Sequence, residues 1–332
     1  MNQRRRLVVA AASLATLRAA AVAQTAGARS RLVRIGRLSE GGATALTSAL
    51  LATFRDALRR HGYADVEIET RYAEGNPQRG LEVTQELVRM NVDVIWVSGS
   101  AATRAVKDAT GTIPIVMVSA DAVKAGLVAN LARPEANLTG LTLVGTELVA
   151  KRIEMLKEIA PKTVRLTALV PGPNATQYPI VVDWLQHSER AARALGLAFH
   201  FAELAPDPDR WSDPFAGFAA APGNALSVVE SPFFNTHSER LVQLALRNRL
   251  PAVFSFRRYV EDGGLLAFGI NLQHIAERSA YYVARILDGA RPRDLPVEQP
   301  TKYEIVVNAA TAKALGLTIP RSVLLRADEV IG

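Results

Sequence analysis

Segments with the pattern of β-strands alternate with segments of helical periodicity along almost the whole chain. Residues 66–72 alternate apolar and polar side chains, as a half-buried strand does. Residues 46–58 place leucine or phenylalanine at every fourth position, the spacing of one helix face, and Gly62 follows as a stop. The expected strands are residues 32–38, 66–72, 92–97, 113–118 and 138–144 in the first half, and 164–170, 197–202, 226–230, 252–256 and 265–270 in the second.

This alternation favours parallel sheets covered by helices, because the right-handed crossover between two parallel strands usually contains a helix. A chain of 332 residues is long enough for two domains. The two halves show the same order of elements and are similar in size, which argues against one very wide sheet. The predicted fold class is therefore α/β, with two Rossmann-like lobes.

The first 23 residues have the features of an export signal. Arg4, Arg5 and Arg6 form a positive start, residues 7–17 are apolar, and residues 21–23 have the small–x–small form that precedes a cleavage site. A lipoprotein anchor is excluded because it needs a cysteine, and the chain has none. We expect residues 1–23 to be a cleavable signal peptide and the mature chain to be freely soluble in the periplasm. The alternative is an alanine-rich N-terminus that remains on a cytoplasmic protein.

Charge and composition exclude several functions. The net charge is +7, but four of these charges are arginines of residues 1–23, and the remainder is scattered along the chain. So small a surplus does not form a nucleic-acid footprint. Without cysteine there is no disulfide, no thiolate metal site and no cysteine nucleophile.

The sequence carries no recognisable catalytic motif. The five histidines are isolated and lack metal-ligand spacing. No GxxxxGK[ST] phosphate loop, no GxGxxG turn after a strand and no GxSxG elbow occurs. We therefore expect a chain that is not an enzyme and that uses neither a metal nor another cofactor.

Binding signals gather at the expected strand ends. Parallel α/β sheets bind ligands beyond the carboxyl ends of their strands, and the residues at these positions are polar or aromatic. The candidate ligand-binding residues are Ser39, Glu40, Ser98, Gly99, Ser100, Thr103, Ser119, Asp121, Asn174, Thr176, Glu230, Ser231, Phe233, Phe256 and Arg257.

In the first half, residues 98–103 join an expected buried strand to a helix. The free N–H groups at the helix start, together with the hydroxyls of Ser100 and Thr103, can hold a carboxylate. In the alternative interpretation Ser100 only caps its own helix. Asp121 can pair with a ligand ammonium or hydroxyl, or it can bond its own backbone as a turn residue.

In the second half, Asn174 and Thr176 lie in a loop that suits a turn as well as a ligand. Glu230 can supply a second carboxylate, and the rings of Phe233 and Phe256 can face a ligand, although rings at strand ends often belong to the core. Arg257 is either an anion clamp or part of a solvated basic pair.

Several motifs resemble, in order, those of one family. They are Ile35-Gly36-Arg37-Leu38-Ser39, Ile113-Pro114-Ile115-Val116, Leu131-Ala132-Arg133-Pro134 and the run Leu295-Pro296-Val297-Glu298-Gln299-Pro300-Thr301-Lys302-Tyr303. After the leader, nearly the whole chain resembles the ABC-transporter substrate-binding proteins of the type I periplasmic class. Within that class it is similar to the branch related to tryptophan and other aromatic amino-acid binders.

The resemblance implies two Rossmann-like lobes joined by three crossover segments, closing on a small solute. One lobe would comprise residues 31–141 plus 272–297, and the other residues 142–271 plus 298–332. The family's Ser/Thr loop corresponds to Ser98-Gly99-Ser100. Its Asp-Pro-Val loop corresponds to Asp121-Ala122-Val123, where alanine replaces the proline.

We therefore expect an exported receptor that binds a small polar solute, with an amino acid, in particular an aromatic one, as the best fit. The receptor would deliver the solute to an ABC permease in the inner membrane, act as a monomer and bind no nucleic acid. Three alternatives stay open at this point: a sensory ligand-binding module, an enzyme and a transcriptional regulator of the same fold. The regulator would need a helix-turn-helix where this chain has its leader.

Overall fold

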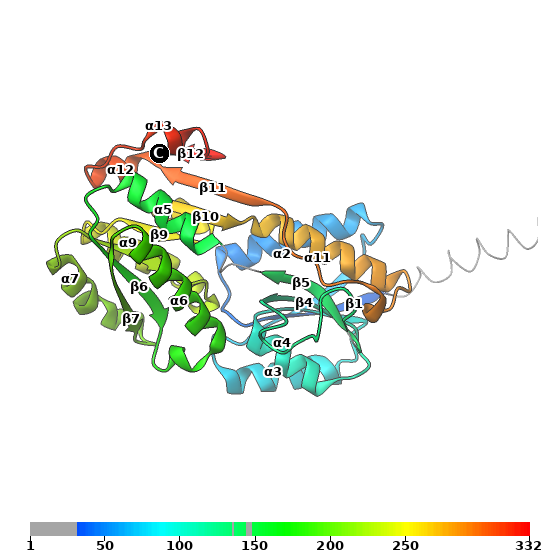
Figure 1. Cartoon of the computed structure of the whole chain (residues 1–332). Helices are drawn as coiled ribbons and strands as arrows, with labels where there is room; N and C mark the ends of the chain where they lie inside the picture. The colour runs from blue at the N-terminus through cyan, green and yellow to red at the C-terminus, as the bar shows by residue number, and fades with distance from the viewer. Residues whose placement is uncertain (1–31, 135, 144–147) are drawn as a thin grey trace, which may run out of the picture.

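The computed structural model describes residues 32–134, 136–143 and 148–332. The expected signal peptide, residues 1–23, lies outside these residues. The described part forms two α/β lobes, which stand side by side in Figure 1. Each lobe contains a wholly or mainly parallel sheet flanked by helices, as the strand–helix alternation predicts.

The first lobe holds a five-stranded sheet in the order β2-β1-β3-β4-β5, in which every pairing is parallel. Its strands are β1 (Val33–Ser39), β2 (Val66–Tyr72), β3 (Val94–Ser98), β4 (Ile115–Ala120) and β5 (Leu138–Leu143). In register, Ser39 lies opposite both Tyr72 and Ser98. The carboxyl ends of neighbouring strands therefore meet at one edge of this sheet.

Helices cover both faces of the first sheet. They are α2 (Ala45–Arg60), α3 (Pro77–Arg89), α4 (Ser100–Ala109) and α11 (Leu272–Leu287). Ile35 of β1 packs in the cluster with α2 and α11, whereas Leu38 packs in the cluster with α3 and α4. On the first of these faces Phe54 of α2 stacks on Trp96 of β3, with ring centroids 4.0 Å apart. These side chains point to opposite faces as alternation along a strand requires.

The second lobe holds a seven-stranded sheet in the order β12-β11-β10-β9-β8-β6-β7. Its strands are β6 (Arg165–Pro171), β7 (Ala198–Leu204), β8 (Asn224–Val228), β9 (Ala252–Phe254), β10 (Leu266–Ile270), β11 (Tyr303–Asn308) and β12 (Glu329–Ile331), and its helices are α5 (Val149–Ile159), α6 (Pro179–Ala194), α7 (Ser212–Ala220), α8 (Pro232–Thr236), α9 (Ser238–Arg247), α10 (Arg257–Glu261), α12 (Ala309–Ala314) and α13 (Arg321–Leu324). Short 3-10 turns are η3 (Ala175–Gln177), η4 (Pro208–Trp211) and η5 (Pro292–Asp294). In the described part of the chain no helix is both long and apolar enough to cross a membrane.

One strand of the second sheet departs from the parallel pattern. β11 pairs antiparallel with β10, with Tyr303 opposite Ile270. The reason is topological: β10 ends where the chain leaves for the first lobe, and β11 begins where the chain returns from it. The two strands therefore run side by side in opposite directions, and strand–helix alternation alone does not predict this pair.

The chain passes between the lobes three times. It crosses between β5 and α5, between β10 and α11, and between Glu298 and β11. Glu298 still pairs with Leu141 at the end of the first sheet, whereas Tyr303 already pairs in the second. Helix α11 packs on α2 and on the first sheet, although it follows strands of the second lobe in sequence. The lobes are thus interwoven rather than consecutive.

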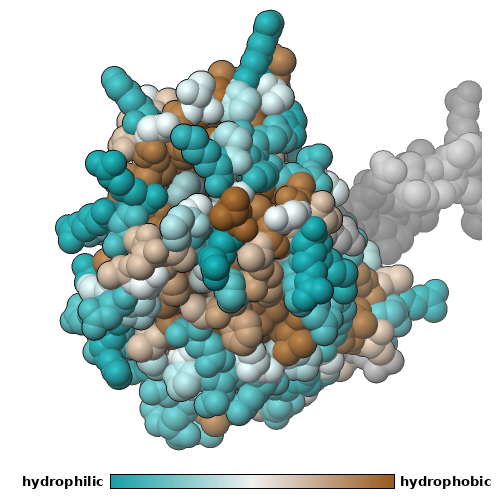
Figure 2. All heavy atoms as spheres, turned by 60° about the vertical axis from the view of Figure 1, so that its left-hand side comes forward, coloured by the Kyte–Doolittle hydropathy of each residue, from teal (hydrophilic) through white to brown (hydrophobic). Residues whose placement is uncertain are grey.

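Strand β7 forms one edge of the second sheet. Its outer residues are largely exposed, and Phe201 keeps 49% of its surface in solvent. Figure 2, in which the side of the second lobe comes forward, shows hydrophobic atoms distributed among hydrophilic ones. Isolated exposed apolar side chains are normal at protein surfaces.

Candidate functional site

Segments that follow strand ends of the two sheets contact each other. Gly42, after β1, donates its backbone N–H to the Thr236 hydroxyl in α8, after β8, over 3.2 Å. Lys124, after β4, forms an ion pair of 2.8 Å with Asp183 in α6, after β6. The carboxyl-terminal edges of both sheets, which carry the candidate residues, therefore face one boundary between the lobes.

Glu40 occupies the start of α4. Its Oε2 accepts hydrogen bonds from the backbone N–H groups of Ala101 at 3.0 Å and Ala102 at 3.3 Å. Gly99 is the N-cap, with φ at 105°, and a Cβ on it would lie 2.2 Å from Glu40 Oε2. The alternative interpretation, in which Ser100 caps this helix, is wrong: Ser100 is the first helical residue, and the carboxylate of a neighbouring segment accepts from the free N–H groups instead.

The electrostatics of Glu40 combine two opposing effects. Burial raises the pKa of its carboxyl, while the N–H groups of Ala102 and Ala101 partly offset this by stabilising the charged form. The sequence predicts a ligand carboxylate at these N–H groups, and the structure places a carboxylate of the chain there. A second anion at the same point would be repelled.

Arg37 is a buried cation that sequence reasoning did not select. Only 6% of it is exposed, and its guanidinium lies 4.1 Å above the Trp96 ring. It donates to the Ser98 hydroxyl over 3.0 Å and to the Leu38 carbonyl. Burial lowers its pKa to about 10, partly opposed by the charge of Tyr72. The available signal was the position of Arg37 in β1, two residues after Ile35 and therefore on the face that Ile35 buries, in a strand that also contains Arg34.

Three other candidates of the first lobe make bonds within the chain. Thr103 is fully buried and donates its hydroxyl to the Gly99 carbonyl over 2.6 Å. Ser119 is buried against a methionine sulfur. Asp121 accepts the N–H of Lys124 over 3.1 Å, which is the turn interpretation of this residue.

Glu230 follows β8 and pairs with a buried arginine. Arg152 of α5, with 3% of its side chain exposed, donates to Glu230 Oε1 over 2.7 Å and to the Phe268 carbonyl over 2.6 Å. The next residue, Ser231, caps α8 by accepting the N–H of Phe233 over 3.2 Å. The charge of Glu230 is thus balanced inside the second lobe.

The two candidate rings belong largely to the core of the second lobe. Phe233 packs against Trp211 and His237, with ring centroids 5.9 and 4.9 Å apart. Phe256 is 5% exposed and lies in the main apolar cluster of this lobe. Phe233 is only partly buried, so it is the more accessible of the two.

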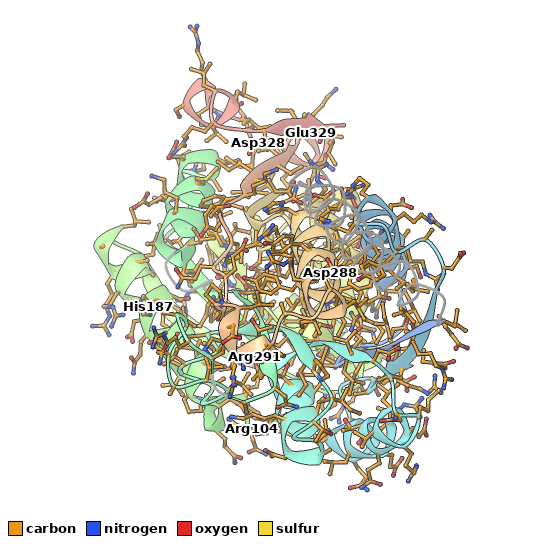
Figure 3. The ribbon with its side chains drawn as sticks, turned by 90° about the vertical axis from the view of Figure 1, so that its right-hand side faces the viewer. Arg104, His187, Asp288, Arg291, Asp328 and Glu329 are labelled. Carbon is orange, nitrogen blue, oxygen red and sulfur yellow. The ribbon has the colours of Figure 1, made fainter. Side chains whose placement is uncertain are left out.

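Arg257 joins α10 to the edge of the second sheet. Its guanidinium pairs with Glu304 of β11 at 3.1 Å and with Glu329 of β12 at 2.7 Å. Figure 3 shows Glu329 beside Asp328 at the C-terminal end of the ribbon. These pairs tie α10 to β11 and β12, so the guanidinium is engaged within the chain.

Asn174 and Thr176 lie in an exposed loop after β6. Asn174 has φ at 72° and precedes η3, which contains Thr176. Tyr178 follows with 60% of its surface exposed. Among the described residues, the side chains of Asn174 and Thr176 have no hydrogen-bond partner, so they are available to another molecule.

Comparison with known proteins defines the class of this two-lobed fold. A family model described as ABC transporter substrate binding protein matches residues 46–189 and 221–331. The chain belongs to this family. Its fold is that of the type I periplasmic binding proteins.

Individual relatives are similar over most of their length. The chain is 24% identical over 271 residues to a tyrosine-binding protein of Clostridioides difficile (strain R20291), covering 80% of this chain and 75% of the relative. A structure from Streptococcus pneumonia, an ABC domain in complex with L-Trp, has a TM-score of 0.79 at 24% identity, over 91% of this chain and all of that one. A conserved domain protein from Vibrio cholerae has a TM-score of 0.80 at 26% identity, over 90% of this chain and all of that one.

Proposed function

We propose that this chain is the exported solute receptor of an ABC importer and that it binds its solute at the boundary between the lobes. The carrying observation is the convergence of strand ends from both sheets on that boundary, where Gly42 contacts Thr236 and Lys124 contacts Asp183. Ligands of parallel α/β sheets bind at such strand ends. The family to which the chain belongs supports the same role.

The proposed solute is an amino acid with an aromatic side chain. The relatives support this class, since one is a tyrosine-binding protein and another was solved with L-Trp. Glu40 uses only Oε2 to hold α4, which leaves Oε1 for a ligand ammonium. The exposed ring of Tyr178 and the partly buried ring of Phe233 offer apolar surface from the second lobe.

The proposed ligand contacts differ in whether their polar atoms already have a partner within the chain. The side chains of Ser100, Asn174 and Thr176 have no hydrogen bond to the described part of the chain. They can therefore bond a ligand without breaking a hydrogen bond within the protein. Asp121 and Arg257 make bonds of their own and act more indirectly. The other candidates are largely buried or bonded within the chain, and we keep them as proposed residues of the same site that shape it: Ser39, Ser98, Gly99, Thr103, Ser119, Glu230, Ser231 and Phe256.

Closure would work by a shift of population. A solute that contacts both lobes favours the closed arrangement by the extra contacts it makes there, whereas a solute held by one lobe shifts nothing. The ion pair of Lys124 with Asp183 spans the boundary and adds to the closed state. Lobes of residues 31–141 plus 272–297 and 142–271 plus 298–332 would move as units about the three crossovers.

The proposal includes the setting of the receptor. The leader directs the chain to the periplasm, where it acts as a soluble monomer, binds without catalysis and delivers its solute to an inner-membrane permease. Its family supports a transport context.

Calorimetry on the leaderless chain tests the proposed function. L-tyrosine, L-tryptophan and L-phenylalanine are titrated into the wild-type chain and into the Ser100→Ala and Thr176→Ala variants. We expect one site per chain, and about tenfold weaker binding in each variant, because each loses one hydrogen bond. The control is Ser322→Ala, whose hydroxyl bonds Glu158 on α5 away from the boundary. Unchanged affinity in the Ser100→Ala/Thr176→Ala double variant would disprove the location of the site.

A further inference from the structure

Arg37 is a buried cation near the strand ends that has no acidic partner in the described part of the chain. Lys124 pairs with Asp183, and Arg152 pairs with Glu230. In the described part of the chain, by contrast, no carboxylate lies within ion-pair distance of Arg37. Its charge is held only by a hydroxyl, a carbonyl and a ring face.

The guanidinium of Arg37 lies at the carboxyl end of the sheet. The side chain starts within β1 and reaches the Leu38 carbonyl and the hydroxyl of Ser98, which is the last residue of β3. The Arg37 guanidinium stacks on one face of the Trp96 ring, and Phe54 stacks on Trp96. The charge is therefore fixed on a packed aromatic base at the edge that faces the second lobe.

A buried, unpaired cation is costly unless a partner completes it. Arginine carries five N–H donors in a planar fork that suits a carboxylate. Arg37 donates hydrogen bonds to the Leu38 carbonyl and the Ser98 hydroxyl, which use only some of these donors. The start of α4 does not serve an anionic ligand, because Glu40 already fills it. Among the described strand-end residues of the first lobe, Arg37 is therefore a buried cation that still has N–H donors for an anion.

We infer that Arg37 binds the anionic group of the solute, the carboxylate in the case of an amino acid. The inference rests on the proposed function, because it needs a solute between the lobes. In this arrangement the α-carboxylate of an amino acid binds Arg37 in β1, and its α-ammonium binds Glu40, which directly follows β1. Each charged group of the solute thus meets an opposite charge. Recognition of the acid group then depends on a side chain and not on a helix start.

The test compares acids with their neutral amides. L-tyrosine, L-tryptophan, L-tyrosinamide and L-tryptophanamide are titrated calorimetrically into the wild-type chain and into Arg37→Gln, Arg37→Lys and Arg34→Gln. We expect Arg37→Gln to weaken binding of the acids about 100-fold and to leave the amides nearly unchanged. Arg37→Lys should keep part of the preference for acids. Arg34→Gln is the matched control, since Arg34 lies at the other end of β1 and pairs with Glu67.

Two outcomes overturn the inference while the receptor function stands. In one, Arg37→Gln keeps the wild-type preference for acids. In the other, Arg37→Gln weakens binding of acids and amides equally, and Arg37→Lys restores the affinity for neither. This result would mean that Arg37 has a purely structural role.

If the wild-type chain binds none of these four compounds, native mass spectrometry of the solute retained on purification decides whether Arg37 is an anion site. A retained acidic solute that Arg37→Gln loses supports Arg37 as the anion site and rejects the aromatic amino acid. A retained solute without an acidic group rejects the role of Arg37.

Discussion

Gly41 and Pro232 lie on opposite lobes at disulfide distance, in a chain without cysteine. A Cβ on Gly41 would lie 3.4 Å from the Pro232 Cβ, and disulfides span roughly 3.5–4.5 Å between these atoms. A shift of a few tenths of an ångström therefore suffices. We predict that the Gly41→Cys/Pro232→Cys variant oxidises readily to one disulfide that holds the lobes together.

The size of the effect follows from the loop that the bond closes. Roughly 190 residues lie between the two positions, and the loss of chain entropy in the unfolded state then amounts to about 5 kcal/mol. Strain from the short Cβ separation reduces this figure. The same bond blocks opening of the lobes, so the oxidised variant should neither take up nor release solute at a measurable rate until a reductant is added.

Thiol titration, thermal unfolding with and without reductant, and solute exchange measured by fluorescence form the assay. The single variants Gly41→Cys and Pro232→Cys are the controls, because neither can form the bond within one chain. Persistent free thiols in the double variant under mild oxidant would refute the placement of these lobes. Normal solute exchange in the oxidised variant would refute binding between them.

Three further predictions concern the strand ends. Gly99→Ala should lower the free energy of unfolding by about 2 kcal/mol or more, because both the positive φ of Gly99 and its contact with Glu40 disfavour a Cβ. Gly75 also has a positive φ but no atom within 4 Å of a Cβ, so Gly75→Ala should lower the free energy of unfolding less in the same urea titration. Because burial raises the pKa of Glu40, the folded chain binds its proton more tightly than the unfolded chain. The contribution of Glu40 to stability should therefore fall as the pH rises above the ordinary carboxyl value of 4.5, so the wild-type chain should lose stability relative to Glu40→Gln over this range. The same pH dependence in both chains, measured by urea unfolding, would contradict it. Arg152→Met should lower the free energy of unfolding by about 3–5 kcal/mol, because it leaves the partly buried charge of Glu230 without a partner. The double variant Arg152→Met/Glu230→Met should regain much of this stability. An equal loss of stability in both variants would argue against a stabilising ion pair.

The strand–helix order was predictable because it depends on local periodicity. The strand expected at residues 66–72 coincides with β2, and the alternation as a whole predicts the two α/β lobes. The antiparallel pairing of β11 was not predictable in this way, since it results from the return of the chain from the other lobe.

The chemistry of the strand ends was harder to predict, because it depends on contacts between distant segments. A local pattern assigns the cap of α4 to Ser100, but the carboxylate that holds this helix start comes from Glu40, 61 residues before Ala101. Arg37 lies in β1 together with the more exposed Arg34, and composition alone does not tell which of the two charges is buried. Only the three-dimensional arrangement shows that no carboxylate of the described residues lies within ion-pair distance of Arg37.

The packing of α11 on the first sheet has a consequence for how the chain matures. The apolar surface around Phe54 and Trp96 is shared with Val283 of this helix, so a nascent chain shorter than about 290 residues leaves that surface uncovered. The amino-terminal half cannot finish folding while the ribosome still holds the rest of the polypeptide. Under the export that we propose, this delay would lengthen the time for which the chain stays unfolded before it leaves the cell interior.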